Sequence, residues 1–238
     1  MKDKKTRWQL AQKYEFNWWK KRENVINPDY YIESASEIRS YYSDYKELSP
    51  ETCILEIGSG AAGILTFLSE SKQRFAIDPL EYFYATVPSF TGIRDNSVQY
   101  FTAKGEELPF ENNKFDVVII DNVLDHCENP YKVMDEVKRT LKTNGFVYFR
   151  QNTYSRYGKF ARFVMELFLV DKGHPFTFRK NELYKLFNLK GFVIKKVEQD
   201  GYFKTWKREI TSFSLKDKIK ALLFITRDKV TFFIQNVS

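Results

Sequence analysis

Apolar runs with the length of a buried strand recur through the middle of the chain, separated by stretches with helical periodicity. The runs occupy residues 52–57, 74–78, 98–102, 115–120 and 146–150. The run at 115–120 is almost continuously apolar, as expected for a central parallel strand covered on both faces. Repeated strand–helix units of this kind predict a parallel α/β sheet with right-handed crossovers.

The periodicity continues on both sides of this core. Helices are expected over residues 6–23, 31–46, 155–170, 180–189 and 214–226, with further strands over 192–197 and 230–237. We therefore expect an N-terminal helical cap over 1–50 and an α/β domain over 51–238. Helical cover insertions are expected in that domain near 153–190 and 201–228.

A glycine-rich turn follows the first expected strand, in the segment Glu56-Ile57-Gly58-Ser59-Gly60-Ala61-Ala62-Gly63. Glycines allow a sharp turn and a close approach of ligand to backbone, and the N–H groups of the next helix, expected at about 61–71, would face that ligand. Asp78 ends the second strand, where a carboxylate can accept hydrogen bonds from ribose hydroxyls. The combination predicts a site for an adenosine-containing cofactor.

The glycine spacing alone also matches the dinucleotide fingerprint. However, more than fifty residues precede the loop, whereas NAD-binding domains usually begin with it. The Tyr-x-x-x-Lys pair of short-chain dehydrogenases occurs before the loop, at 42–46, and within an expected strand, at 100–104. An NAD-dependent oxidoreductase is therefore disfavoured.

The segments that follow the loop complete a resemblance to a known family. In order along the chain they are Glu56-x-Gly58-x-Gly60, Asp78, Gly105-Glu106-Glu107-Leu108-Pro109-Phe110, Phe115-Asp116-Val117-Val118 and Leu141-Lys142-Thr143-Asn144-Gly145. As a set, over about 52–150, they resemble the class I S-adenosylmethionine-dependent methyltransferases, in the type 11 or UbiE-like small-molecule branch. The resemblance implies a Rossmann-like, seven-stranded, mostly parallel sheet of order 3-2-1-4-5-7-6, flanked by helices. It also implies S-adenosylmethionine as cofactor and S-adenosylhomocysteine as product.

The same resemblance implies a set of cofactor-binding residues: Glu56, Gly58, Ser59, Gly60, Asp78, Pro79, Gly105, Glu106, Asp121 and Asn122. The glycine loop would pack against the methionine part, with Glu56 helping to hold its amino group. Asp78 would hold the ribose, and Glu106 would lie beside the adenine. Lys104 departs from the family pattern, because an acid often stands there to receive the adenine amino group and a lysine cannot accept a hydrogen bond.

Two histidines are the candidate catalytic bases. Methyl transfer from a sulfonium is an in-line displacement, in which one general base suffices when the acceptor is a hydroxyl. His126 follows the fourth strand, near the expected methyl position, and His174 lies in a loop after the fifth. The alternative for His126 is a structural role beneath the next helix. A cover that excludes water is expected from the aromatic residues Trp18, Trp19, Tyr30 and Tyr31.

Charge and composition bear on partners and location. The net charge of +7 is concentrated in residues 1–22 and 201–238, which favours an anionic or lipid-linked acceptor, a membrane surface or nucleic acid over a neutral partner, unless these are simply solvated lysine faces. Two cysteines and a charged start without an apolar segment favour the cytoplasm. The apolar runs are too short to span a membrane, and two histidines without a C-x-x-C pair favour no metal site.

We therefore expect an S-adenosylmethionine-dependent methyltransferase that acts on a small-molecule or glycan-like acceptor at oxygen. One alternative is a tRNA-modifying methyltransferase, since basic flanks with aromatic residues suit nucleic acid, although this partner is less favoured. Another is a non-catalytic methyltransferase-like binding module.

Overall fold

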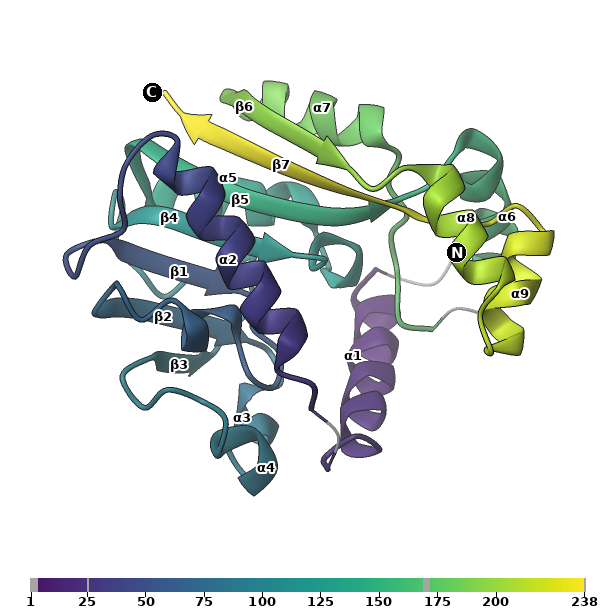
Figure 1. The fold of residues 1–238 in the computed structure, drawn as a ribbon, viewed down its shortest axis with the longest axis horizontal. Helices are drawn as coiled ribbons and strands as arrows, with labels where there is room; N and C mark the ends of the chain where they lie inside the picture. The colour runs from purple at the N-terminus through teal and green to yellow at the C-terminus, as the bar shows by residue number, and fades with distance from the viewer. Residues whose placement is uncertain (1–3, 25, 169–171, 238) are drawn as a thin grey trace.

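The computed structural model describes residues 4–24, 26–168 and 172–237, and its centre is a seven-stranded sheet (Figure 1). The strands are β1 (Cys53–Ile57), β2 (Gln73–Asp78), β3 (Gln99–Thr102), β4 (Phe115–Asp121), β5 (Leu141–Thr153), β6 (Phe192–Gln199) and β7 (Asp228–Asn236). Their order is β3-β2-β1-β4-β5-β7-β6, with β7 antiparallel to both of its neighbours. The predicted strand order is confirmed.

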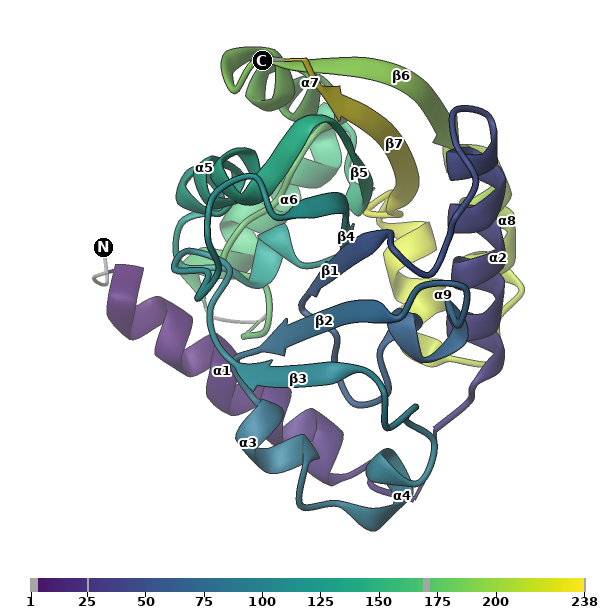
Figure 2. The same cartoon turned by 90° about the vertical axis from the view of Figure 1, so that its left-hand side faces the viewer.

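Helices flank this sheet on both sides (Figure 2). The α-helices are α1 (Lys4–Lys20), α2 (Asp29–Ser43), α3 (Glu81–Tyr84), α4 (Pro88–Thr91), α5 (Pro130–Thr140), α6 (Arg156–Leu167), α7 (Lys180–Leu189), α8 (Tyr202–Ile210) and α9 (Leu215–Leu222). Two short 3₁₀ helices are η1 (Ile64–Phe67) and η2 (Leu124–His126). The residues 169 and 170 of the expected 155–170 helix lie outside the described residues.

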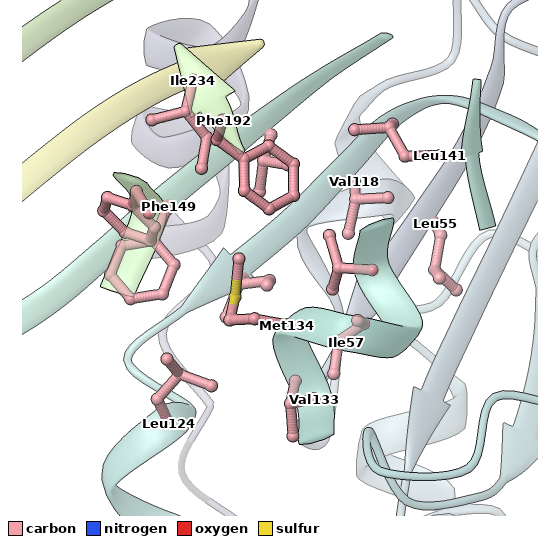
Figure 3. Packing of buried hydrophobic residues seen from close by; sticks show 14 of the residues in the cluster. Leu55, Ile57, Val118, Leu124, Val133, Met134, Leu141, Phe149, Phe192 and Ile234 are labelled. Carbon is pink, nitrogen blue, oxygen red and sulfur yellow. The ribbon is translucent and has the colours of Figure 1, made fainter. Parts of the chain in front are cut away.

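The alternation of side chains along the strands builds two cores, one on each face of the sheet. On one face, Leu55 and Val118 pack with α5 and α7, and Figure 3 shows Val133 and Met134 of α5 beside Ile57 of β1. On the other face, the strand residues pack with α2 and η1. Both faces of β1 and β4 are therefore buried, as expected for central parallel strands.

Helix α2 belongs to the sheet rather than to a cap. Its Ala35, Ile38 and Tyr41 are buried in the second core, whereas α1 lies at the carboxyl ends of β1, β2 and β3 (Figures 1 and 2). The expected cap thus narrows to α1, and the boundary at residue 50 stays a prediction. None of the helices in the described ranges combines the length and apolar character needed to cross a bilayer.

The expected helix over 61–71 is wrong, because only the single 3₁₀ turn η1 forms there. Gly63 precedes this turn with a φ of +78°, a left-handed conformation that a helix does not continue through. Further along, α8 and α9 form within the helical insertion expected near 201–228, and β5 runs on to Thr153 because β7 pairs with it as far as Asp228.

Candidate functional site

A cavity of about 460 Å³ opens at the carboxyl ends of β1, β2 and β4. Ligands of open α/β sheets bind at this edge. The cavity lining includes every cofactor-binding residue implied by the resemblance: Glu56, Gly58, Ser59, Gly60, Asp78, Pro79, Gly105, Glu106, Asp121 and Asn122. The opposite wall is α1, which contributes Trp8, Gln12, Glu15, Trp18 and Trp19. The fold thus gathers residues from five separate segments around one cavity.

The glycine loop turns tightly at the end of β1. Gly58 and Gly60 have φ values of +73° and +60°, which L-residues with side chains rarely adopt. A Cβ atom added at Gly58 would lie 2.5 Å from Val123 Cγ2, and one added at Gly60 would lie 3.4 Å from the Trp19 ring. Glycine at position 58 therefore keeps the loop packed against the chain that follows β4.

Glu56 stabilises the end of this loop, where η1 begins. Its carboxylate is buried and accepts hydrogen bonds from the backbone N–H groups of Ile64 at 2.9 Å and Leu65 at 3.1 Å. Burial raises the pKa of Glu56 to about 8, an effect that outweighs the two N–H donors. Glu56 also lines the cavity, so its suggested contact with the cofactor amino group stays a prediction alongside its role in holding η1.

Asp78 joins the loop to the end of β2. Its carboxylate accepts hydrogen bonds from the N–H of Gly60 at 3.0 Å and that of Leu80 at 2.8 Å. An ionised carboxylate has about four acceptor positions, so two remain for the hydroxyls of a ribose. Burial raises the pKa of Asp78 to about 6.

The expected adenine edge is held by the segment before α5. Glu106 is buried and accepts hydrogen bonds from the N–H groups of Glu128 at 2.7 Å and Asn129 at 3.0 Å. Lys104 points toward α1, with its Nζ 3.8 Å from the centre of the Trp8 ring. The lysine that breaks the family pattern is thus a contact to the covering helix, and the adenine contact of Glu106 stays a prediction.

Asp121 and Asn122, at the end of β4, form a further polar wall of the cavity. Asp121 pairs with Arg150 of β5 at 2.7 Å and accepts a hydrogen bond from the Tyr30 hydroxyl at 2.6 Å. Asn122 takes a left-handed φ of +57°, and its side-chain oxygen accepts the N–H of Asn152 at 3.1 Å. These contacts tie β4, β5 and the start of α2 into one rigid corner.

The two histidines, 48 positions apart in sequence, meet beside the cavity, with ring centres 4.5 Å apart. His126 lines the cavity; its Nε2 lies 3.8 Å from Asp125 Oδ1 and its Nδ1 lies 3.9 Å from Glu15 Oε2. Asp125, His126 and His174 offer ligand atoms within 4.8 Å of one another, a group that could hold a metal ion. The expectation of no metal site therefore stays a prediction.

Sequence reasoning missed three residues that shape the site, namely Trp8, Glu15 and Arg150. Arg150 had a signal in the sequence, because it is a cation at the end of an expected apolar strand. The structure buries it, with 3% of its surface exposed. Trp8 and Glu15 had none, since nothing in a helical pattern shows which distant edge of the sheet a helix will cover. The four residues expected to form an aromatic cover, Trp18, Trp19, Tyr30 and Tyr31, all line the cavity, and their exclusion of water stays a prediction.

An S-adenosyl cofactor fits the residues present. Ser59 lines the cavity, is 3% exposed, and its hydroxyl has no hydrogen-bond partner within the described part of the chain. A buried hydroxyl without a partner carries an energetic penalty that a polar ligand would remove. Together with the free acceptor positions of Asp78, it leaves polar groups on the cavity wall for a ligand with hydroxyl and amino groups.

Comparisons with known proteins agree with this geometry. A family model described as a methyltransferase domain matches residues 55–149. The ubiquinone biosynthesis O-methyltransferase of Rickettsia bellii is 32% identical over 144 residues, 56% of this chain and 56% of that protein. The human thiol S-methyltransferase TMT1B is 25% identical over 150 residues, 60% of this chain and 62% of that protein. The chain thus spans only a little over half the length of these curated relatives.

Solved structures share the fold. The geranyl diphosphate C-methyltransferase of Streptomyces coelicolor A3(2) superposes with a TM-score of 0.64 at 14% identity, covering 85% of this chain and 79% of that one. Sequence motifs, sheet order and relatives converge on one family. Residues 55–149 match a methyltransferase domain, and the sheet order is that expected from the resemblance to the class I S-adenosylmethionine-dependent methyltransferases.

Proposed function

We propose that the protein transfers a methyl group from S-adenosylmethionine to a hydroxyl oxygen of a small-molecule acceptor. The observation that carries this proposal is the cavity at the strand ends, where Asp78 keeps free acceptor positions and Ser59 an unpartnered hydroxyl. The names of the curated relatives, an O-methyltransferase and a thiol S-methyltransferase, support a small acceptor. An anionic or lipid-linked acceptor suits the basic flanks.

When bound, S-adenosylmethionine supplies an electrophilic methyl group on a sulfonium. The chain has to hold the acceptor in line with that group and keep water out, tasks for the α1 wall and the rigid corner at Asp121. His126 is the proposed base, because it lines the cavity. On accepting the proton from the hydroxyl, its ring would become an imidazolium between the carboxylates of Asp125 and Glu15.

His174 has a different place in this proposal. Its ring lies against that of His126, and the N–H of Phe176, two residues on, donates to the Asp125 carbonyl at 3.3 Å. The loop that carries His174 is thereby attached to η2. His174 is therefore proposed to position His126, in place of the direct catalytic role expected from sequence.

Titration calorimetry with S-adenosylhomocysteine, alongside NAD, tests the cofactor. We expect the homocysteine product to bind and Asp78→Asn to weaken binding by about 1.5–3 kcal/mol, the contribution of hydrogen bonds to a charged group. This corresponds to roughly ten- to a hundredfold in the dissociation constant. Asp44→Asn, an exposed acid beyond the end of α2, is the matched control and should leave binding unchanged. Binding of NAD without binding of S-adenosylhomocysteine would overturn the proposal.

A further inference from the structure

A second cavity, of about 380 Å³, adjoins the cofactor cavity. Tyr30, Asp121 and Asn122 line both of them. The remaining lining residues come from β5, from α8 and from the segments around β7, and they are Arg150, Asn152, Asp200, Thr205, Arg208, Arg227 and Lys229. Its volume is within the range of small-molecule sites, about 300–1,000 Å³.

The charges in this second cavity are unevenly balanced. Arg150 is neutralised by Asp121, and Lys229 lies 3.6 Å from Asp200. Arg208 and Arg227 are exposed, and neither has an ion-pair partner among the residues that the structure describes. Both acids of the lining are thus engaged, and two guanidinium groups remain without a counter-charge.

We propose that the second cavity binds a phosphate monoester group of the methyl acceptor, through Arg208 and Arg227. This inference rests on the proposed function, because it names the substrate class of that same site. A phosphate monoester carries about −1.5 to −2 charge at neutral pH, which matches two unpaired arginines. The planar fork of a guanidinium also suits phosphate oxygens better than a lysine ammonium does.

The wall shared by the two cavities allows one acceptor molecule to occupy both of them. A phosphate held between α8 and the start of β7 places the rest of its molecule toward Tyr30, Asp121 and Asn122. Beyond that wall lies the cavity lined by His126. The body of the acceptor would then reach the methyl group, while its charge stays at the open side where arginines from two separate segments converge.

Binding measurements on the whole protein test this subsite. The probes are phenyl phosphate, a soluble monoester, and vesicles of phosphatidylcholine with or without phosphatidic acid, a monoester carried by a lipid. The double variant Arg208→Gln, Arg227→Gln is compared with Lys72→Gln, Lys185→Gln, which removes the same charge from exposed lysines elsewhere. S-Adenosylhomocysteine is titrated into every variant.

We expect phosphate-dependent binding to fall by about ten- to a hundredfold in the arginine variant and by less than about twofold in the lysine variant. Binding of phenyl phosphate assigns a soluble acceptor, and binding only to vesicles with phosphatidic acid assigns a lipid-borne one. Absence of both, or equal binding by the two variants, overturns the subsite. S-Adenosylhomocysteine binding is measured separately. If the native protein does not bind it, the result counts against the proposed function and not against the phosphate site.

Discussion

At the scale of single residues, Gly58 shows how closely the chain packs at the end of β1. Its backbone is left-handed and a side chain would meet Val123, so two independent restrictions apply to one position. Gly201 offers a contrast, because its φ is +93° but nothing lies within 4 Å of an added Cβ. The pair separates the effect of backbone conformation from that of packing.

We predict that Gly58→Ala destabilises the protein more than Gly201→Ala does. Both substitutions place an alanine at a positive φ, at a cost of about 1–3 kcal/mol. Gly58→Ala adds overpacking against Val123, about 1–3 kcal/mol. Urea unfolding of the two variants gives the difference directly. Equal losses of unfolding free energy would mean that the loop yields and that packing against Val123 is unimportant.

Glu56 makes the stability of the cofactor-free protein depend on pH. Its folded pKa, raised by burial to about 8, lies above its ordinary value of 4.5. Between these values the folded state keeps a proton that the unfolded state releases, so stability decreases as pH rises, by at most about 1.4 kcal/mol per pH unit. Above about pH 8 this contribution no longer changes.

Glu56→Gln should remove this dependence, since an amide does not titrate. We expect the unfolding free energy of the native protein, minus that of the variant, to decrease steadily from pH 5 to pH 8. Thermal or urea unfolding across that range, without cofactor, measures the difference. Parallel curves for the two proteins would show that Glu56 stays ionised in the fold.

At the scale of elements, the position of α1 decides whether the cofactor cavity is enclosed. Arg7 of α1 pairs with Glu166 of α6, with Nη2 to Oε2 at 2.8 Å, and donates to the Lys172 carbonyl at 2.8 Å. Trp19, farther along α1, packs edge-on against Tyr84 and Phe90. The helix is thus attached to the rest of the protein near both of its ends.

Arg7→Gln should loosen the start of α1. The Arg7 side chain is buried whereas Glu166 is partly exposed, and the substitution removes both their ion pair and the hydrogen bond to the Lys172 carbonyl. We therefore expect faster amide hydrogen exchange in the first turns of α1. Lys20→Gln, an exposed change at the other end of the same helix, is the control. If the two variants exchange at the same rate, the contact to Glu166 does not hold the helix in place.

At the scale of the whole molecule, the sheet brings together segments that are distant in the sequence. The rings of His126 and His174 lie against each other, and Arg208 and Arg227 line one cavity. Both arrangements depend on β4, β5 and β7 lying side by side in the sheet. The fold also determines where the positive charge of residues 201–238 lies. From sequence it is an excess over a whole segment, and in the structure part of it lines a cavity beside the cofactor site.

The sequence alone determined the core strands and the place of the cofactor pocket, for two physical reasons. Buried parallel strands need continuous apolar runs, and a cradle for a ligand needs glycines and acids at set distances from them. These are local requirements, and Gly58 and Asp78 meet them within a short stretch of chain. The order of the strands in the sheet came from the family resemblance.

The tertiary structure decided the features that depend on distant contacts. Gly63, with its positive φ, interrupts the expected helix, and Glu56, seven positions earlier, accepts the first two N–H groups of the short η1 turn that forms instead. The choice of α1 rather than α2 as the cover, the pairing of the histidines and the second cavity all depend on which surfaces meet. Local periodicity does not predict these tertiary contacts, because it shows only which face of an element is apolar and not which other element that face will pack against.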